Sequence, residues 1–105
     1  MGKNQVQKEL KIFAARAKKN LKAEKVILFG SYATGEANDY SDIDVAVLSK
    51  IFAKIPFEKR LDILYPLMKG LELDFHPFGL TPSELAKTSP VSVLSEIRTS
   101  GKVIV

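Results

Sequence analysis

Two short apolar runs, joined by a loop of turn-forming residues, constrain the fold of this chain more than any other feature. The first run, residues 26–29, predicts a buried strand. It ends at Gly30, which permits backbone conformations that a β-carbon hinders and lets a phosphate approach closely. Ser31 then offers a hydroxyl and a backbone N–H at the start of a short helix, where anions bind well. The turn after this strand is therefore a candidate phosphate site.

Two aspartates mark the start of the second apolar run, residues 43–48, which predicts another strand. Asp42 and Asp44 are two positions apart, so in a strand both carboxylates point to one face. Two carboxylates that close repel each other unless a cation lies between them. Mg²⁺ binds carboxylate and phosphate oxygens. Each half of the pattern has an ordinary explanation as a turn or cap, but together they predict a metal-dependent nucleotide site.

An alternating segment, residues 71–78, predicts a third strand. The alternation places Glu72, Asp74 and His76 on one face and apolar residues on the other. If this strand lies beside residues 43–48, Asp74 completes a cluster of three carboxylates for two Mg²⁺ ions, or serves as a general base. Glu72 is the rival for that role. We prefer Asp74, because an acid between two large apolar neighbours has little structural reason to be there. We expect His76 to be a hydrogen-bonded edge residue, not a ligand.

The remaining periodicity predicts helices around these strands. We expect helices over 3–22, over 57–68 with Pro66 kinking it or ending it early, over 82–87 behind a capping box at Thr81-Pro82-Ser83-Glu84, and from Pro90 to about Ser100, followed by a strand or tail at 103–105. With strands at 25–29, 43–48 and 71–78, the chain is expected to form a single α/β domain over residues 1–105.

Positive charge is concentrated at the start of the chain. Residues 1–25 contain eight Lys and Arg against two acids, whereas the remaining residues contain eight against ten. A basic helix attracts nucleic acid, an acidic partner or phosphates, but we favour the simpler explanation of a solvated outer face. The chain has no cysteine, which excludes disulfides, thiolate zinc sites and a Cys nucleophile and suits a cytoplasmic location. No apolar run is long enough to span a membrane.

The residues around the first two strands resemble a known family. The run 28–37, Leu-Phe-Gly-Ser-Tyr-Ala-Thr-Gly-Glu-Ala, followed by Ser41-Asp42-Ile43-Asp44, is similar to the signature of the polymerase β-type nucleotidyltransferase superfamily: Gly-Ser, ten residues, Asp-x-Asp. The short chain resembles its minimal members, the MNT proteins of HEPN–MNT toxin–antitoxin pairs. One departure is Thr34, where such proteins often carry Arg or Lys.

This resemblance implies a small mixed β-sheet, α+β in class, with helices packed on one side. It also implies that Gly30 and Ser31 contact a triphosphate and that Asp42, Asp44 and Asp74 are the metal-binding and catalytic acids. The implied reaction is Mg²⁺-dependent transfer of a nucleotide, AMP from ATP, to a hydroxyl acceptor, with two ions at the site.

Little of the chain remains to bind an acceptor once the nucleotide site is assigned, so we expect another molecule to present it. The resemblance implies a HEPN toxin, neutralised by adenylylation of a tyrosine, by tight binding, or by both. Two alternatives remain: a non-catalytic antitoxin that acts by binding alone, and an RNA-binding or RNA-modifying module that uses the basic first helix.

Overall fold

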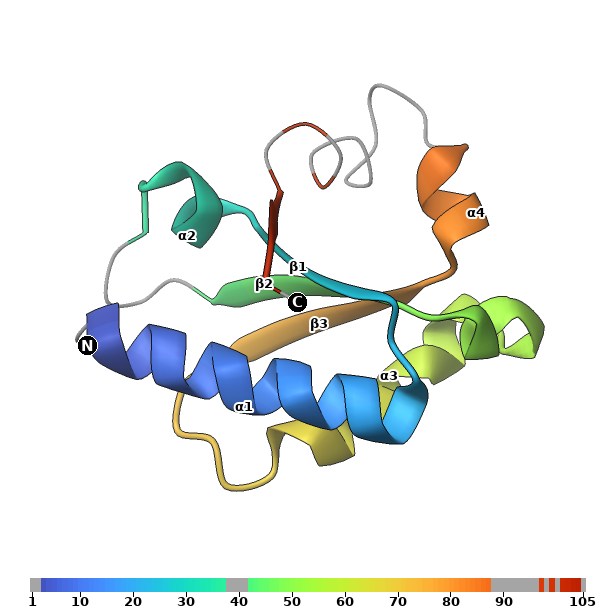
Figure 1. Cartoon of the computed structure of the whole chain (residues 1–105), viewed down its shortest axis with the longest axis horizontal. Helices are drawn as coiled ribbons and strands as arrows, with labels where there is room; N and C mark the ends of the chain where they lie inside the picture. Colours follow the sequence, from blue (N-terminus) through green and yellow to red (C-terminus); the bar gives the residue numbers. More distant parts are fainter. Residues whose placement is uncertain (1–2, 38–41, 88–96, 98, 100, 105) are drawn as a thin grey trace.

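The centre of the molecule is a four-stranded mixed sheet in the order β3-β2-β1-β4 (Figure 1). The structure is a computed structural model that describes residues 3–37, 42–87, 97, 99 and 101–104. The strands are β1 (Lys25–Phe29), β2 (Ile43–Leu48), β3 (Phe75–Leu80) and β4 (Lys102–Val103). β2 pairs antiparallel with β1 and parallel with β3, while β4 pairs antiparallel with β1. The prediction of a small mixed sheet with helices is therefore confirmed.

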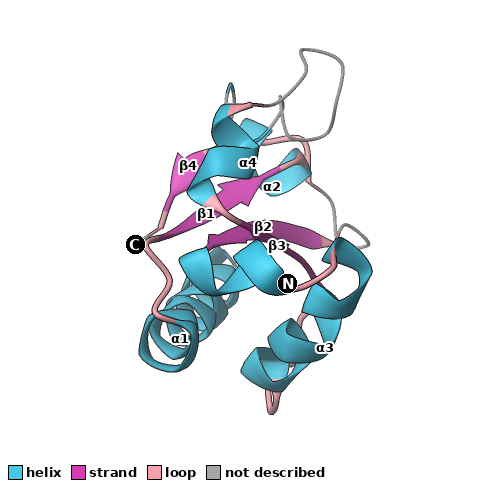
Figure 2. Cartoon of the chain, turned by 90° about the vertical axis from the view of Figure 1, so that its right-hand side faces the viewer, coloured by secondary structure: helices cyan, strands magenta, loops and turns pink. Residues whose placement is uncertain are grey.

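Helices cover the sheet unequally. The long α1 (Lys3–Leu21) and the short α3 (Arg60–Leu64) lie on one side of it, as expected, whereas α4 (Pro82–Ala86) lies toward the other (Figure 2). The short α2 (Ser31–Thr34) follows β1, and its Ala33 packs in the cluster on the α1 side. Within the described ranges, no helix combines the length and hydropathy that a membrane span requires.

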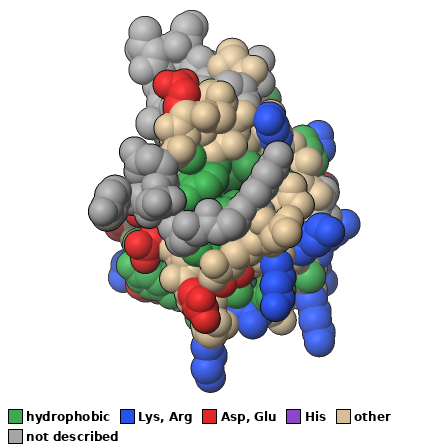
Figure 3. All heavy atoms as spheres, turned by 90° about the vertical axis from the view of Figure 1, so that its left-hand side faces the viewer, with side chains coloured by type: hydrophobic (Ala, Val, Ile, Leu, Met, Phe, Trp, Pro, Cys, Tyr) green, Lys and Arg blue, Asp and Glu red, His purple; other side chains and the backbone are tan. Residues whose placement is uncertain are grey.

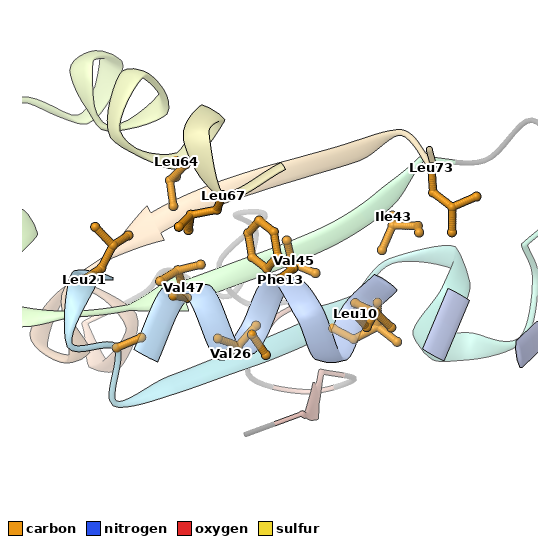
Figure 4. Packing of buried hydrophobic residues seen from close by; sticks show 14 of the residues in the cluster. Leu10, Phe13, Leu21, Val26, Ile43, Val45, Val47, Leu64, Leu67 and Leu73 are labelled. Atoms are coloured by element: carbon orange, nitrogen blue, oxygen red, sulfur yellow. The ribbon is translucent and has the colours of Figure 1, made fainter. Parts of the chain in front are cut away.

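The larger core lies between α1 and the sheet (Figure 4). The apolar side chains of α1 recur at helical spacing, so one stripe of the helix faces the strands. Phe13 is fully buried and stacks on Phe75 of β3, with ring centroids 5.2 Å apart. Val45 and Val47 of β2 point into the same core and are also fully buried.

A smaller cluster occupies the opposite face of the sheet. Its buried members are Ile27, Phe29, Ala46, Leu48, Leu80 and Ile97. Phe78 of β3 and Leu85 of α4 pack against it. This second face also carries Asp44, because Asp44 precedes Ala46 by two positions in the same strand.

The helix predicted over residues 57–68 is divided into three parts. A 3₁₀ turn, η2 (Phe57–Lys59), leads into α3, and a second 3₁₀ turn, η3 (Tyr65–Met68), follows. Pro66 lies in the first turn of η3. Since proline has no N–H to donate to the preceding turn, the α-helix ends at Leu64, and the prediction of an early end is confirmed.

The third strand begins later than predicted. It starts at Phe75, so Glu72 and Asp74 precede it, and the expected alternation over 71–78 is wrong at its start. The cause is Glu9 on α1, whose side chain is only 6% exposed. Its carboxylate accepts the backbone N–H groups of Glu72 at 3.1 Å and Leu73 at 3.0 Å. These groups therefore bond to a helix side chain and not to a neighbouring strand.

Two other predictions concern the end of the chain. The capping box before α4 is confirmed: Thr81 N–H donates to the Glu84 carboxylate at 2.8 Å, and Glu84 N–H donates to the Thr81 hydroxyl at 3.1 Å. Most of the helix predicted from Pro90 to Ser100 lies outside the described residues. A further 3₁₀ turn, η1 (Lys50–Lys54), was not predicted.

Candidate active site

The turn after β1 and the aspartate of β2 are in direct contact. In the β1–β2 register Phe29 pairs with Asp44, so Gly30 follows directly beside the Asp44 side chain. Gly30 has φ of 73° and ψ of −154°, a backbone conformation that residues with a β-carbon rarely adopt. A β-carbon at Gly30 would also clash with the Asp44 carboxylate. The local conformation and the close approach both require glycine, and the structure brings the two predicted motifs together.

The other side of β2 brings in β3. Asp44 pairs with His76 in the parallel register, and His76 Nδ1 lies 3.3 Å from Asp44 Oδ1. The backbone N–H of Ile43 donates to the carbonyl oxygen of Asp74 at 2.8 Å. Continuing the register by two residues therefore sets Asp74 opposite Asp42, and both are exposed. The expectation that this segment lies beside residues 43–48 is confirmed.

Glu72, the rival of Asp74, turns toward a different part of the molecule. Its carboxylate accepts a hydrogen bond from the side-chain amide of Gln5 on α1 at 3.0 Å. Glu72 therefore faces α1, whereas Asp44 lies on the opposite face of the sheet. The prediction that Glu72 and His76 share a face is wrong, because the chain before Phe75 is not in the strand.

The electrostatics of the aspartate pair favour a cation. Partial burial raises the pKa of the Asp44 carboxyl, and the charge of Asp42 raises it further, while the hydrogen bond from His76 acts in the opposite direction. A hard divalent ion relieves this repulsion, and the oxygen donors of two carboxylates suit Mg²⁺. Within the described ranges, no three Asp, Glu, His or Cys side chains form a ready metal-binding group. The role of Asp74 as a third acid stays a prediction.

α2 holds the other predicted phosphate residue. Ser31 begins this four-residue helix and is half-buried. Its carbonyl oxygen accepts the N–H of Glu36 at 2.9 Å. The Thr34 hydroxyl lies 3.4 Å from the carbonyl oxygens of both Gly30 and Ser31. Thr34 stands at the position where the resembled proteins often carry a cation. Its hydroxyl instead contacts backbone carbonyl oxygens of its own turn.

His76 has surroundings that the sequence did not reveal. It is a hydrogen-bonded residue on an edge strand, as predicted. Its ring lies 4.8 Å from that of Phe78, which in turn lies 6.4 Å from the exposed ring of Phe57. These rings and Leu61 border a hollow of about 220 Å³ along β3. Alternation within the strand predicts that His76 and Phe78 share a face. No local sequence pattern predicts that Phe57 lies near either of them.

The basic first helix lies away from the aspartates. Exposed lysines lie along α1. Figure 3 shows Lys and Arg side chains gathered on the lower part of the face that it displays. Arg16 is not part of this surface, since its guanidinium donates to the carbonyl oxygens of Leu67 at 2.9 Å and Lys69 at 2.7 Å. α1 packs on the face of the sheet opposite to Asp44.

The chain also matches the profile of a known protein family. Residues 10–98 match the profile of the nucleotidyltransferase domain family. The match covers most of the chain, so the protein belongs to this family and is a nucleotidyltransferase by class.

Two archaeal relatives and one solved structure are similar to the chain. "Putative protein adenylyltransferase MJ1305" of Methanocaldococcus jannaschii is 32% identical over 82 residues, which are 75% of this chain and 56% of that protein. "Putative protein adenylyltransferase MJ0141" of the same organism is 31% identical over 80 residues, 76% of this chain and 77% of that protein. The chain thus spans little more than half the length of the first relative.

The solved structure is described as a toxin–antitoxin with AMP-PNP. It superimposes with a TM-score of 0.61 at 24% identity, covering 92% of this chain and 70% of that one. At this identity the likeness establishes the fold.

Proposed function

We propose that this protein transfers AMP from ATP to a hydroxyl group of a partner protein in a Mg²⁺-dependent reaction. The observation that carries the proposal is the contact between Gly30 and Asp44, which joins a phosphate-binding turn to a carboxylate pair on the neighbouring strand. The names of the two relatives support ATP as the donor and a protein as the acceptor. Residues 1–105 act in this proposal as a single nucleotidyltransferase domain.

Each predicted residue has a distinct task. Asp42 and Asp44 would hold Mg²⁺ at the start of β2, and Gly30 and Ser31 would bind the triphosphate at the end of β1. The bound ion would supply neutralisation of the charge on the phosphate oxygens and on the leaving pyrophosphate. Asp74 supplies a further carboxylate or accepts the proton of the attacking hydroxyl. The fold contributes mainly by positioning these groups in advance.

The order of the strands supports one direction of attack. Gly30 and Ser31, the proposed triphosphate residues, follow β1 on one side of β2, and Asp74 precedes β3 on the other side. In an in-line displacement the attacking oxygen and the leaving group occupy opposite sides of the phosphorus. Pyrophosphate therefore leaves toward Gly30 and Ser31, and the acceptor hydroxyl approaches from β3. A bond forms between the hydroxyl oxygen and the α-phosphorus while the bond from that phosphorus to the β-phosphate breaks.

We further propose that the acceptor is a tyrosine of a HEPN-type toxin, which makes this chain the antitoxin of a pair. The toxin–antitoxin neighbour with AMP-PNP is consistent with that assignment. Adenylylation and tight binding are separable means of neutralisation. Replacing both Asp42 and Asp44 with Asn removes the carboxylate pair, so toxin neutralisation that survives intact would identify binding alone as the mechanism.

The direct test uses α-labelled ATP and Mg²⁺ with a small helical protein encoded beside this chain. We expect label on that protein at tyrosine, dependent on Mg²⁺ and absent with γ-labelled ATP. The Asp42→Asn, Asp44→Asn double variant should transfer none. Label on RNA instead would favour the RNA-modifying alternative, and label on neither substrate would contradict transfer to both.

A further inference from the structure

The hollow along β3 lies on the side of the site from which the acceptor must approach. We infer that it is the acceptor subsite, and that it holds the aromatic ring of a hydroxyl-bearing side chain, tyrosine, presented by the partner protein. This inference rests on the proposed function, because it places the second substrate of that reaction. His76 connects the two regions: it borders the hollow, and its Nδ1 lies 3.3 Å from Asp44 Oδ1.

The lining offers apolar walls to a flat ring and polar groups beside them. Phe57, Leu61 and Phe78 supply the apolar walls. His76 supplies a polar atom at the end nearest Asp44, and the charged residues Glu58 and Arg60 also border the hollow. Aromatic pairs are stabilised by more than the area that they bury. Phe57 is 51% exposed although it is large and apolar, and burial under a partner's ring would remove that surface from water. At about 220 Å³ the hollow is small and matches one aromatic side chain better than a folded segment.

A buried arginine fixes the wall of the hollow before any acceptor arrives. The Arg60 guanidinium lies 5.7 Å from the centroid of the Phe57 ring, within range of a cation–π contact. Its donors reach the carbonyl oxygens of Gly79 at 2.9 Å and Phe52 at 2.8 Å. The same group pairs with Glu84 of α4 at 2.6 Å. Because Arg60 joins these elements and contacts the Phe57 ring, it restrains that side chain. Little conformational entropy of Phe57 is therefore lost when the acceptor binds.

The strand edge itself is unsuited to binding an added strand. Pro77 lies in β3 and has no N–H to donate, and the Gly79 carbonyl oxygen is already bonded to Arg60. Recognition at this edge therefore falls to side chains. A tyrosine ring seated among them would direct its hydroxyl past His76 toward the α-phosphate above Asp44. Its oxygen would bond to that phosphorus, pyrophosphate would leave, and Asp74 would take the proton.

N-acetyl-L-tyrosinamide tests the subsite without a partner protein. His76 is the only histidine, so its ring signals in a ¹H–¹³C spectrum are unambiguous. We expect saturable shifts of these signals on titration, with a Kd in the range of about 1–10 mM for so small a ligand. N-acetyl-L-serinamide, which lacks the ring, should cause none. The titration is run with and without Mg²⁺ and AMP-PNP.

Two variants locate the binding. Phe57→Ser removes a wall of the hollow and should weaken N-acetyl-L-tyrosinamide binding at least fivefold, with AMP-PNP affinity unchanged. Tyr65→Ser is the matched control, since Tyr65 is 56% exposed on the adjoining turn and does not border the hollow. Melting temperatures show that both variants are folded.

Three results would overturn the inference: no saturable shift, equal weakening in both variants, or weaker AMP-PNP binding in Phe57→Ser, which would assign the hollow to the nucleobase. Failure of AMP-PNP to bind the wild-type protein would instead contradict the proposed function, while the titration without nucleotide still decides the subsite.

Discussion

The two faces of β2 present different kinds of side chain near its start. Toward α1, the strand presents Ile43, Val45 and Val47, which are at most 1% exposed. Toward the other side it presents Asp44, a half-buried carboxylate beside Gly30 and His76. On this second face only Asp44 belongs to the candidate site, since Ala46 and Leu48 are buried in the smaller apolar cluster.

This contrast separates stability from chemistry. The α1 face gains free energy by removing apolar side chains from water. Asp44 adds a partly desolvated carboxylate that its neighbour Asp42 repels, which costs folding free energy. This cost is expected of a group that acts in the proposed reaction. Substitutions on the two faces of the same strand, or of the elements packed against them, should therefore have opposite consequences.

The largest effect is expected from Asp44→Asn on the active face. AMP transfer should fall on the order of 10³-fold, about 4 kcal/mol of barrier, because a metal ligand is lost. The pKa of Asp44 is raised by burial and by Asp42, so ionisation above that pKa costs folding free energy that the amide avoids. The melting temperature at pH 7 should therefore not decrease. A large decrease would show that Asp44 supports the fold.

Phe13→Ala on the core face should produce the reverse result. The side chain is fully buried and stacked on Phe75, so its loss should lower the free energy of unfolding by about 3–5 kcal/mol. Urea denaturation followed by circular dichroism measures the change. Tyr65→Ala, at an exposed aromatic, is the control and should change stability by less than about 1 kcal/mol. Equal losses in both variants would contradict the described core.

Gly30→Ala tests the contact between the turn after β1 and the Asp44 carboxylate. The added β-carbon would displace the Asp44 carboxylate, and the positive φ would be strained as well. We expect nucleotide affinity to fall about 10–100-fold, or about 1.4–2.7 kcal/mol. Gly70→Ala isolates the backbone strain, because Gly70 has φ of 81° with no atom within 4 Å of the added carbon. If Gly70→Ala loses as much nucleotide affinity as Gly30→Ala, the proximity of Gly30 to Asp44 does not explain the loss.

The smallest effect concerns Glu9 behind the core. Burial pushes the pKa of its carboxyl up, but hydrogen bonds from Leu73, Glu72 and Gln5, with the charge of Lys8, together leave the pKa lowered. The resulting stabilisation is present above the unfolded pKa, near 4.5, and is lost as pH falls through the lower folded value.

Glu9→Gln should flatten this acid dependence and cost about 1–2 kcal/mol at pH 7. Melting temperatures between pH 3 and pH 7 measure it, with the exposed Glu24→Gln as control. If the melting temperature of Glu9→Gln falls between pH 7 and pH 3 as much as that of the wild type, the role of these hydrogen bonds is contradicted.

Local signals were sufficient for one part of the site. The apolar runs gave β1 and β2 with the predicted bounds, and Gly30, Ser31 and the aspartates follow from residues adjacent in sequence. Pro66 and the capping box at Thr81 likewise act within their own turns.

The features that the sequence did not predict depend on distant partners. The late start of β3 results from Glu9 on a helix 63 positions away from Glu72, which no local alternation reports. The pairing of His76 with Asp44 depends on the parallel register, which strand patterns leave open. Phe57 joins the hollow only because α3 packs against β3.

The central claim, that the Asp44 face is a metal-dependent nucleotide site, is tested most directly by calorimetric titration of AMP-PNP into the wild-type chain and the Asp44→Asn variant. We predict binding to the wild type with Mg²⁺, at least tenfold weaker binding with EDTA, and the same loss in the variant with Mg²⁺ present. Binding that is equally tight in all three titrations would contradict it.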